Sequence, residues 1–166
     1  MAGDRAVVSS GGGTLRRMAS WGEVEREAPG LTGRVREAFE RAKHATMATL
    51  RADGSPRISG TEVEFTDSGT LRLGSMPGAV KARDLLRDPR VAVNSPTADP
   101  GEGGAGWPGE AKVAGVAVAQ PDREDGAHLF DVDLTEVVWT GLSEARDQLV
   151  IQSWHPGRGV EERRRA

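Results

Sequence analysis

The sequence predicts a mainly β protein with a few short helices, folded as a closed or nearly closed antiparallel barrel. Several segments rich in Val, Leu and Ala have the composition and length of strands. Asp53-Gly54 lies between two such segments, which is a strong β-hairpin signal. The first three strands follow one another on short turns, so they form an antiparallel meander with little room for a parallel crossover. Together these observations favour an antiparallel barrel in a chain of this size.

The composition fits one domain with its own core. The chain has 166 residues, and because aromatic residues make up only 4% of it, the core must come mainly from aliphatic side chains. A net charge of −3 argues against attraction to nucleic acid or to an acidic membrane. The lack of cysteine excludes disulfides and a thiolate nucleophile, and three scattered histidines show no metal-ligand spacing.

No stretch has the pattern of a signal peptide or of a membrane-spanning segment. We therefore expect a cytoplasmic protein with no membrane and no nucleic-acid partner.

The N-terminal third predicts an arm and two helices. Residues 1–18 have no periodic apolar pattern and indicate a flexible arm. Ser20 and Glu23 have capping-box spacing for a short helix from Trp21 toward 28, stopped by Pro29-Gly30. Thr32 is a candidate cap for the next helix. Its apolar stripe comprises Leu31, Val35, Ala38, Phe39 and Ala42.

The remainder of the chain predicts strands around one further helix. The predicted strands are 45–50, 56–65, 70–74, 91–94, 110–120, 128–140 and 148–154. Residues 95–109 are rich in Pro and Gly and predict a long loop. The barrel domain is expected to span 19–160, and 161–166 to form a solvated basic tail.

The segment 71–91 is the strongest candidate for a binding site. A strand is followed by a turn of small residues and then by a helix over 79–87. Its predicted apolar face comprises Val80, Ala82, Leu85 and Leu86, and its predicted exposed face Lys81, Arg83, Asp84 and Arg87. A helix N-terminus favours a phosphate or carboxylate, and Lys81 and Arg83 add two cations there. From spacing alone, an ordinary surface helix explains the pattern equally well.

Two motifs resemble one known family. Residues 81–91, KARDLLRDPRV, resemble the Lys-x-x-Asn-Leu-x-x-Asp-Pro-Arg-Val signature of the pyridoxamine 5'-phosphate oxidase-like split-barrel flavoproteins, with Asp84 where Asn is usual. Residues 45–59, ATMATLRADGSPRIS, are similar to the opening hairpin of that family. The resemblance covers about 31–159 and implies a split β-barrel of the FMN-binding type. It also implies a homodimer with the cofactor in the groove between two subunits.

The resemblance implies a set of cofactor-binding residues and no catalytic side chain. The phosphate would be held by Arg57, by Ser75 with Met76, and by Lys81. The flavin ring would lie along Ile58, Ser59 and Gly60, and Trp154 and Arg158 would approach it across the dimer.

Each of these roles has a structural alternative. Arg57 is equally a solvated strand-edge residue, and Ser59 an ordinary outward serine. Trp154 either stacks on a ring or anchors the last strand in the core. His155 is either a general acid or a surface residue.

Three departures bear on the choice of cofactor. Glu62 stands about where the oxidases of the family carry Lys, Val80 where they carry Arg, and Glu110 or Lys112 near where they carry Gln. This pattern fits relatives that use the deazaflavin F420, or relatives that bind another ligand.

The resemblance therefore implies an oxidoreductase that uses FMN or F420 for hydride transfer to a small conjugated or heteroaromatic substrate. The alternative is a non-catalytic split-barrel protein that carries or sequesters haem, another tetrapyrrole or a cofactor.

Overall fold

A computed structural model describes residues 17–166 and confirms a mainly β fold with three short helices. Residues 1–16, nearly all of the predicted arm, lie outside the described residues. In chain order the elements are α1 (Trp21–Glu27), α2 (Pro29–Glu40), β1 (Ala45–Leu50), β2 (Pro56–Phe65), β3 (Leu71–Ser75), α3 (Val80–Arg87), β4 (Arg90–Asn94), β5 (Glu110–Gln120), β6 (His128–Leu142), β7 (Leu149–His155) and β8 (Gly159–Arg165).

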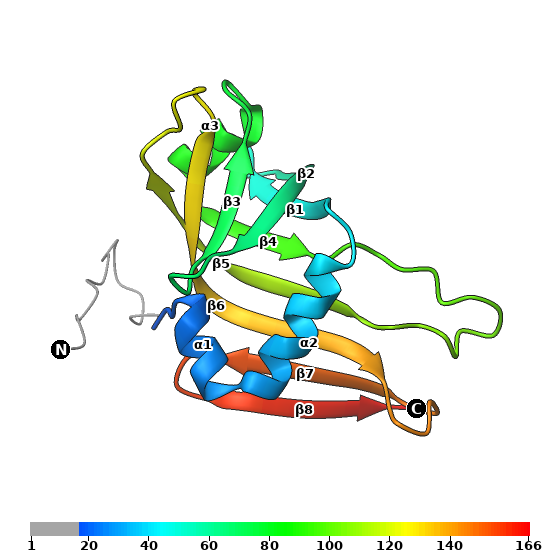
Figure 1. The fold of residues 1–166 in the computed structure, drawn as a ribbon. Helices are drawn as coiled ribbons and strands as arrows, with labels where there is room; N and C mark the ends of the chain where they lie inside the picture. The colour runs from blue at the N-terminus through cyan, green and yellow to red at the C-terminus, as the bar shows by residue number, and fades with distance from the viewer. Residues whose placement is uncertain (1–16) are drawn as a thin grey trace.

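Six antiparallel strands form the barrel, in the order β3-β2-β1-β4-β5-β6. Pairing of β3 with the first part of β6 closes it, from Leu71 opposite Val132 to Ser75 opposite His128. The strands β7 and β8 extend the sheet beyond β6 (Figure 1). Closure leaves no unpaired edge among the six barrel strands.

The long strand β6 belongs to both parts of the sheet. Its first five residues pair with β3, and residues 137–142 pair with β7. Its other edge pairs with β5, with a register shift at Ala114 and Gly115. A methyl group added at Gly115 would collide with the backbone oxygen of Asp133, so glycine lets the two strands approach at this bulge.

The helices α1 and α2 cover the part of the sheet formed by β5, β6 and β7 (Figure 1). The predicted capping box of Ser20 and Glu23 is present. Pro29 ends α1 and also begins α2, because proline suits the first helical position, where no N–H partner is needed. Thr32 is therefore inside α2 and donates its hydroxyl to the carbonyl of Ala28 instead of capping the helix.

Several side-chain predictions need correction. Ala42 follows the end of α2 and is exposed, so it does not extend the apolar stripe. On α3, Val80 and Leu86 are 44% and 60% exposed although both were predicted on the apolar face, whereas Asp84, predicted as exposed, is 2% exposed. Residues 161–165 are not a free tail, since they complete β8 and pair with β7.

Candidate functional site

The candidate site lies where α3 packs beside β1 and β2. The strand β3 ends at Ser75, and a short turn leads into α3 at Val80. Ala82 and Leu85 are buried and hold the helix against the barrel. Figure 1 shows α3 at the end of the barrel farther from β7 and β8.

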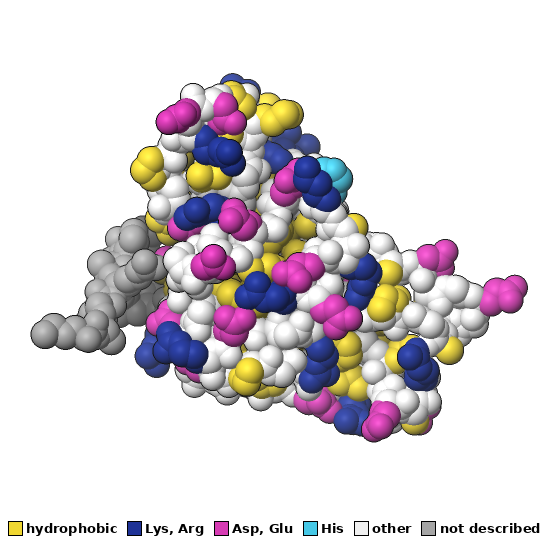
Figure 2. All heavy atoms as spheres, viewed as in Figure 1, with side chains coloured by type: hydrophobic (Ala, Val, Ile, Leu, Met, Phe, Trp, Pro, Cys, Tyr) yellow, Lys and Arg dark blue, Asp and Glu magenta, His cyan; other side chains and the backbone are white. Residues whose placement is uncertain are grey.

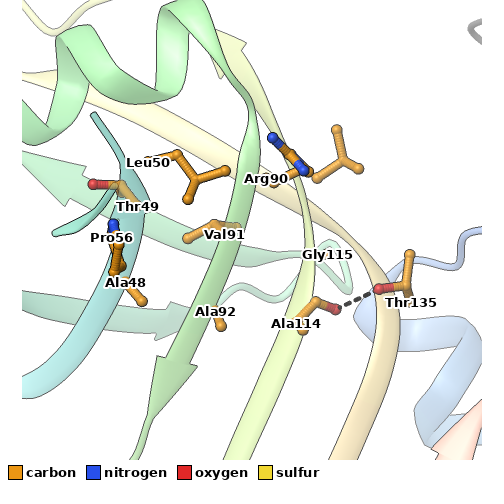
Figure 3. Close-up of a pocket in the computed structure, with 11 residues that line it drawn as sticks. Ala48, Thr49, Leu50, Pro56, Arg90, Val91, Ala92, Ala114, Gly115 and Thr135 are labelled. Atoms are coloured by element: carbon orange, nitrogen blue, oxygen red, sulfur yellow. Dashed lines mark hydrogen bonds between the residues drawn. The ribbon is translucent and has the colours of Figure 1, made fainter. Parts of the chain in front are cut away.

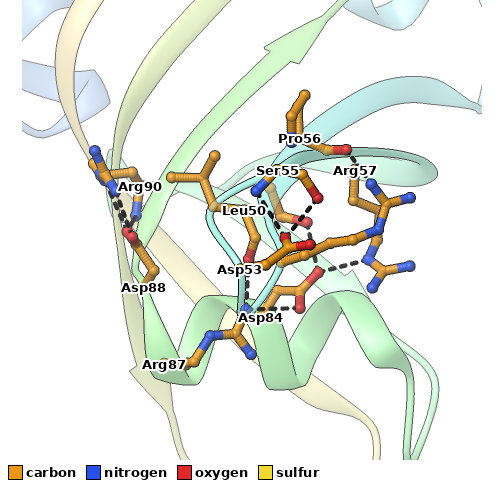
Figure 4. A network of polar contacts seen from close by, with 11 residues as sticks. Leu50, Asp53, Ser55, Pro56, Arg57, Asp84, Arg87, Asp88 and Arg90 are labelled. Carbon is orange, nitrogen blue, oxygen red and sulfur yellow. Dashed lines mark hydrogen bonds and ion pairs between the residues drawn. The ribbon is translucent and has the colours of Figure 1, made fainter.

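Asp84 of α3 is the centre of a buried polar network (Figure 4). Its carboxylate accepts hydrogen bonds from Arg57 Nε at 2.6 Å, from Arg87 Nη2 at 2.9 Å and from Thr49 Oγ1 at 3.0 Å. Burial raises the pKa of Asp84, but these hydrogen bonds lower it by more, so the pKa lies below its ordinary value. The network therefore contains an ionised carboxylate next to two guanidinium groups.

Arg57 faces α3 because it shares a face of β2 with buried Thr61. Its guanidinium is half-buried and uses Nε for Asp84. The pairing of β1 with β2 places Arg57 opposite Thr49, which explains why both reach the same carboxylate. An arginine bonded through Nε retains the donors of its two η nitrogens for a second acceptor.

Lys81 lies one helical turn before Asp84 on α3 and also reaches β2. Its ammonium group donates a hydrogen bond to the carbonyl of Gly60. Burial lowers the pKa of Lys81, against the raising effect of the Glu62 carboxylate. The N-cap residue Ala79 makes no side-chain hydrogen bond to the start of α3, so no side chain caps the helix there.

The structure brings several of the predicted residues to this region but divides them between two faces of β2. Arg57 and Ser59 point to the side of α3, whereas Ile58 is 73% exposed on the opposite face. Gly60 shares the exposed face with Ile58. At the end of β3, Ser75 is buried and Met76 is 78% exposed.

Trp154 and Arg158 are not part of this region within one subunit. Trp154 is 1% exposed, and its indole N–H donates to Glu27 at 2.9 Å, which supports the core-anchor alternative. Arg158 lies on the turn between β7 and β8, where it is exposed and 4.0 Å from Glu161. Figure 1 shows that β7 and β8 are at the opposite end of the molecule from α3.

An apolar groove of about 540 Å³ lies on the outer face of β1, β4 and β5 (Figure 3). Its lining includes Ala48 and Leu50 of β1, Ala92 of β4, and Ala114 and Val116 of β5. This groove was not predicted from the sequence. The sequence feature that could have predicted it is that these strands carry apolar residues at their outward as well as their inward positions.

Two histidines have acidic partners. His128 lies opposite Ser75, at the end of β3, and its Nδ1 is 3.0 Å from Asp122. Sequence reasoning did not connect His128 with the site, because only the long-range pairing of β3 with β6 brings it there. His155 Nε2 is 3.1 Å from Glu136, so this residue is half-buried and paired, not a free surface residue.

The donor set fits a phosphate group. Arg57 offers η nitrogens, Lys81 offers an ammonium group, and the start of α3 has no side-chain cap. Glu62 instead pairs with Lys43 at 3.2 Å. Among residues 17–166 no cluster of His, Asp and Glu has the arrangement of a metal site.

The surface in Figure 2 shows acidic and basic side chains interspersed, with no continuous basic area on this face. None of the helices within 17–166 is long and apolar enough to cross a membrane.

Comparisons with known proteins agree with this architecture. A family model described as "Pyridoxamine 5'-phosphate oxidase" matches residues 31–139. No curated protein matches the sequence.

Two solved structures are similar over most of the chain. PhzG from Burkholderia lata 383, in complex with tetrahydrophenazine-1-carboxylic acid, has a TM-score of 0.56 and 12% identity, covering 83% of this chain and 87% of that one. A pyridoxamine 5'-phosphate oxidase-related, FMN binding protein from Nostoc punctiforme PCC 73102 has a TM-score of 0.55 and 11% identity, covering 82% and 93%. At these identities the likeness shows a shared fold.

Proposed function

The chain belongs to the pyridoxamine 5'-phosphate oxidase family, and from this membership we propose that it is an oxidoreductase using FMN or F420. The cofactor phosphate binds at Arg57 and Lys81, and the reaction is hydride transfer to a small conjugated or heteroaromatic substrate. Support for a flavin-type cofactor comes from the structural neighbour whose name describes an FMN binding protein.

The observation that carries the proposal is the convergence of two cations on one stretch of β2. Arg57 belongs to this stretch, and Lys81 binds the carbonyl of Gly60 three residues further along. A phosphate placed there accepts charge-assisted hydrogen bonds, which are about twice as strong as neutral ones. Ser59 is half-buried between these two positions and adds a hydroxyl donor.

The bound cofactor supplies the hydride chemistry, and the protein binds it, orients it and excludes water. Arg57 and Lys81 fix one end of the ligand. Ser59 shares the face of β2 with Arg57 and is the predicted ring residue that lies beside the proposed phosphate site, whereas Ile58 and Gly60 are on the opposite face. We assign no catalytic side chain.

We also propose that the protein is a homodimer whose site is completed by the partner subunit. The apolar groove on β1, β4 and β5 faces outward, as does Val118, which is 42% exposed. Burying such a surface against a second copy removes apolar area from water. A two-fold dimer then offers two equal sites, with Arg158 of each subunit available to the site of the other.

A titration of the purified protein with FMN and with F420, followed by cofactor fluorescence, tests the proposed function. We expect saturable binding of one or both. If neither binds with a dissociation constant below about 1 mM, which corresponds to about −4 kcal/mol, the proposal is wrong.

A second function is favoured by two features of the site. Val80, 44% exposed, stands at the start of α3 instead of a cation, and Glu62 brings a negative charge beside Lys81. A non-catalytic protein that carries haem or another tetrapyrrole binds singly charged carboxylates instead of a phosphate monoester, which carries about −1.5 to −2 charges. An absorbance spectrum of the protein as purified distinguishes the two, since a haem Soret band supports carriage and a flavin or deazaflavin band supports the oxidoreductase.

A further inference from the structure

Asp84 places a negative charge directly behind the proposed phosphate site. Its side chain is 3% exposed and lies 2.6 Å from Arg57 Nε. Burying a carboxylate costs free energy unless it is paired, and here three donors from β1, β2 and α3 compensate for it. Because three donors hold this carboxylate in place, its negative charge stays at a fixed position beside the site.

The same contacts determine how Arg57 is presented. Asp84 binds Arg57 through Nε, which leaves the N–H groups of the two η nitrogens as donors for a second acceptor. Arg87 approaches Asp84 from the other side, and its Nη2 also donates to the carbonyl of Leu50 at 2.6 Å. Figure 4 shows Arg57 and Arg87 reaching Asp84 from opposite sides. Asp84 therefore separates an arginine facing the ligand from an arginine facing the β1–β2 turn.

The carboxylate also reduces the positive charge available to a ligand. Arg57, Arg87 and Lys81 are cationic, and Asp84 cancels one unit of their charge. Two unit charges about 6 Å apart at an effective dielectric constant of about 20 change a binding constant by about 100-fold, and partial exposure reduces this toward about 10-fold. This loss of affinity applies to each negative charge of the ligand, so a doubly charged ligand loses more affinity than a singly charged one.

We propose that Asp84 is a specificity-determining residue that orients Arg57 and weakens the preference of the site for a doubly charged phosphate monoester over a singly charged phosphate diester. This inference rests on the proposed function. A phosphate monoester carries about −1.5 to −2 charges at pH 7 and a diester carries one. At the phosphate group itself FMN is a monoester and F420 a diester, so the charge of Asp84 opposes the phosphate of FMN more than that of F420.

The test uses two ligands that differ by one negative charge, FMN and the methyl ester of its phosphate. Both share the ring and the ribityl chain, so the ratio of their dissociation constants reports the charge preference. We expect Asp84→Asn to shift this ratio by about 10- to 100-fold in favour of FMN. Thr49→Val is the matched control, because it removes one hydrogen bond to Asp84 but no charge, and its ratio should equal that of the wild type.

The wild type provides a measurement that does not depend on a variant folding. We expect its dissociation constants for FMN and for the methyl ester to differ by less than tenfold, and binding of FMN that is tighter by tenfold or more would overturn the inference. An unchanged ratio in folded Asp84→Asn would also overturn it while leaving the proposed function intact. If FMN, its methyl ester and F420 all fail to bind, both proposals are wrong.

Discussion

The indole N–H of Trp154 on β7 donates a hydrogen bond to Oε2 of Glu27 at the end of α1, across 2.9 Å. The two residues are 127 positions apart in the chain, so this bond joins the beginning and the end of the described fold. Both rings of the indole lie in the core, since the residue is 1% exposed.

We expect Trp154→Phe to lower the free energy of unfolding by about 1–3 kcal/mol, because it leaves Glu27 without its donor and removes buried volume. Urea denaturation measures the change. Glu27→Gln is the matched control, since its amide oxygen still accepts the bond, and it should cost less. An unfolding free energy equal to that of the wild type, together with lost cofactor binding, would instead favour a ligand contact for Trp154.

Replacement of Lys81 by Ala should weaken binding of the phosphate-bearing cofactor by about 1.5–3 kcal/mol, the range of a hydrogen bond to a charged group. Stability should change by about 0.5 kcal/mol or less, because the side chain is only partly buried and its hydrogen bond to the carbonyl of Gly60 is exposed. Arg83→Ala removes an exposed cation from the same helix and should leave affinity unchanged. If Lys81→Ala and the wild type bind the cofactor with equal affinity, Lys81 of α3 does not contribute to ligand binding.

The glycines of β2 and β5 should respond differently to a methyl group. Gly115→Ala is expected to cost about 1–3 kcal/mol of stability, because its Cβ would meet the backbone of Asp133. A Cβ added at Gly60 would have no neighbouring atom within 4 Å, so Gly60→Ala should change the free energy of unfolding by no more than about 0.5 kcal/mol. If a cofactor ring lies on β2, Gly60→Ala should nevertheless weaken its binding. Thermal unfolding and cofactor titration of both variants check these expectations.

Acid should weaken the network around Asp84. Its pKa in the folded protein lies below the ordinary value of 3.8, so its stabilising effect is present above about pH 4 and is lost as the pH falls through the folded pKa. We therefore expect the difference in unfolding free energy between the wild type and Asp84→Asn to shrink as the pH falls from about 5 toward 2. Urea denaturation across this range measures it. A difference independent of pH would show that ionisation of Asp84 does not stabilise the fold.

The proposed subunit face should be sensitive to charge. Ala92→Arg places a cation on the outer face of β4 beside the apolar groove and should raise the dimer dissociation constant by at least tenfold. Ala42→Arg introduces the same side chain at an exposed position away from the groove and is the control. Sedimentation at micromolar concentration follows both variants. A wild type that sediments as a monomer there would contradict the proposed dimer.

Much of the fold could be predicted because its signals are local. The turn signal at Asp53-Gly54 predicted a strand on each side of it. The predicted segments 45–50, 56–65 and 110–120 coincide with β1, β2 and β5. The strand β8 was not predicted, because its charged sequence EERRR has no apolar alternation. Only its pairing with β7 makes it a strand.

The site was harder to predict because its central contacts span distant segments. Helical periodicity placed Lys81 at the start of α3 but left Asp84 on the solvated face, since an aspartate rarely occupies a core position. Burial of Asp84 depends on Arg57, which is 27 residues earlier in the chain. No sequence pattern shows that these two charges meet.

The charged strand β8 also bears on how the protein avoids aggregation. It forms the edge of the sheet beyond the barrel, and its residues Glu161–Arg165 are all exposed. Charged side chains on an edge strand hinder its pairing with the edge of another molecule. The neighbouring strand β7 carries the sequence LVIQSW, which is apolar enough to act as a template for such pairing if its edge were uncovered. In this protein β8 therefore covers the edge of β7. The charged residues that prevented the prediction of β8 as a strand also make it suitable as the edge of the sheet.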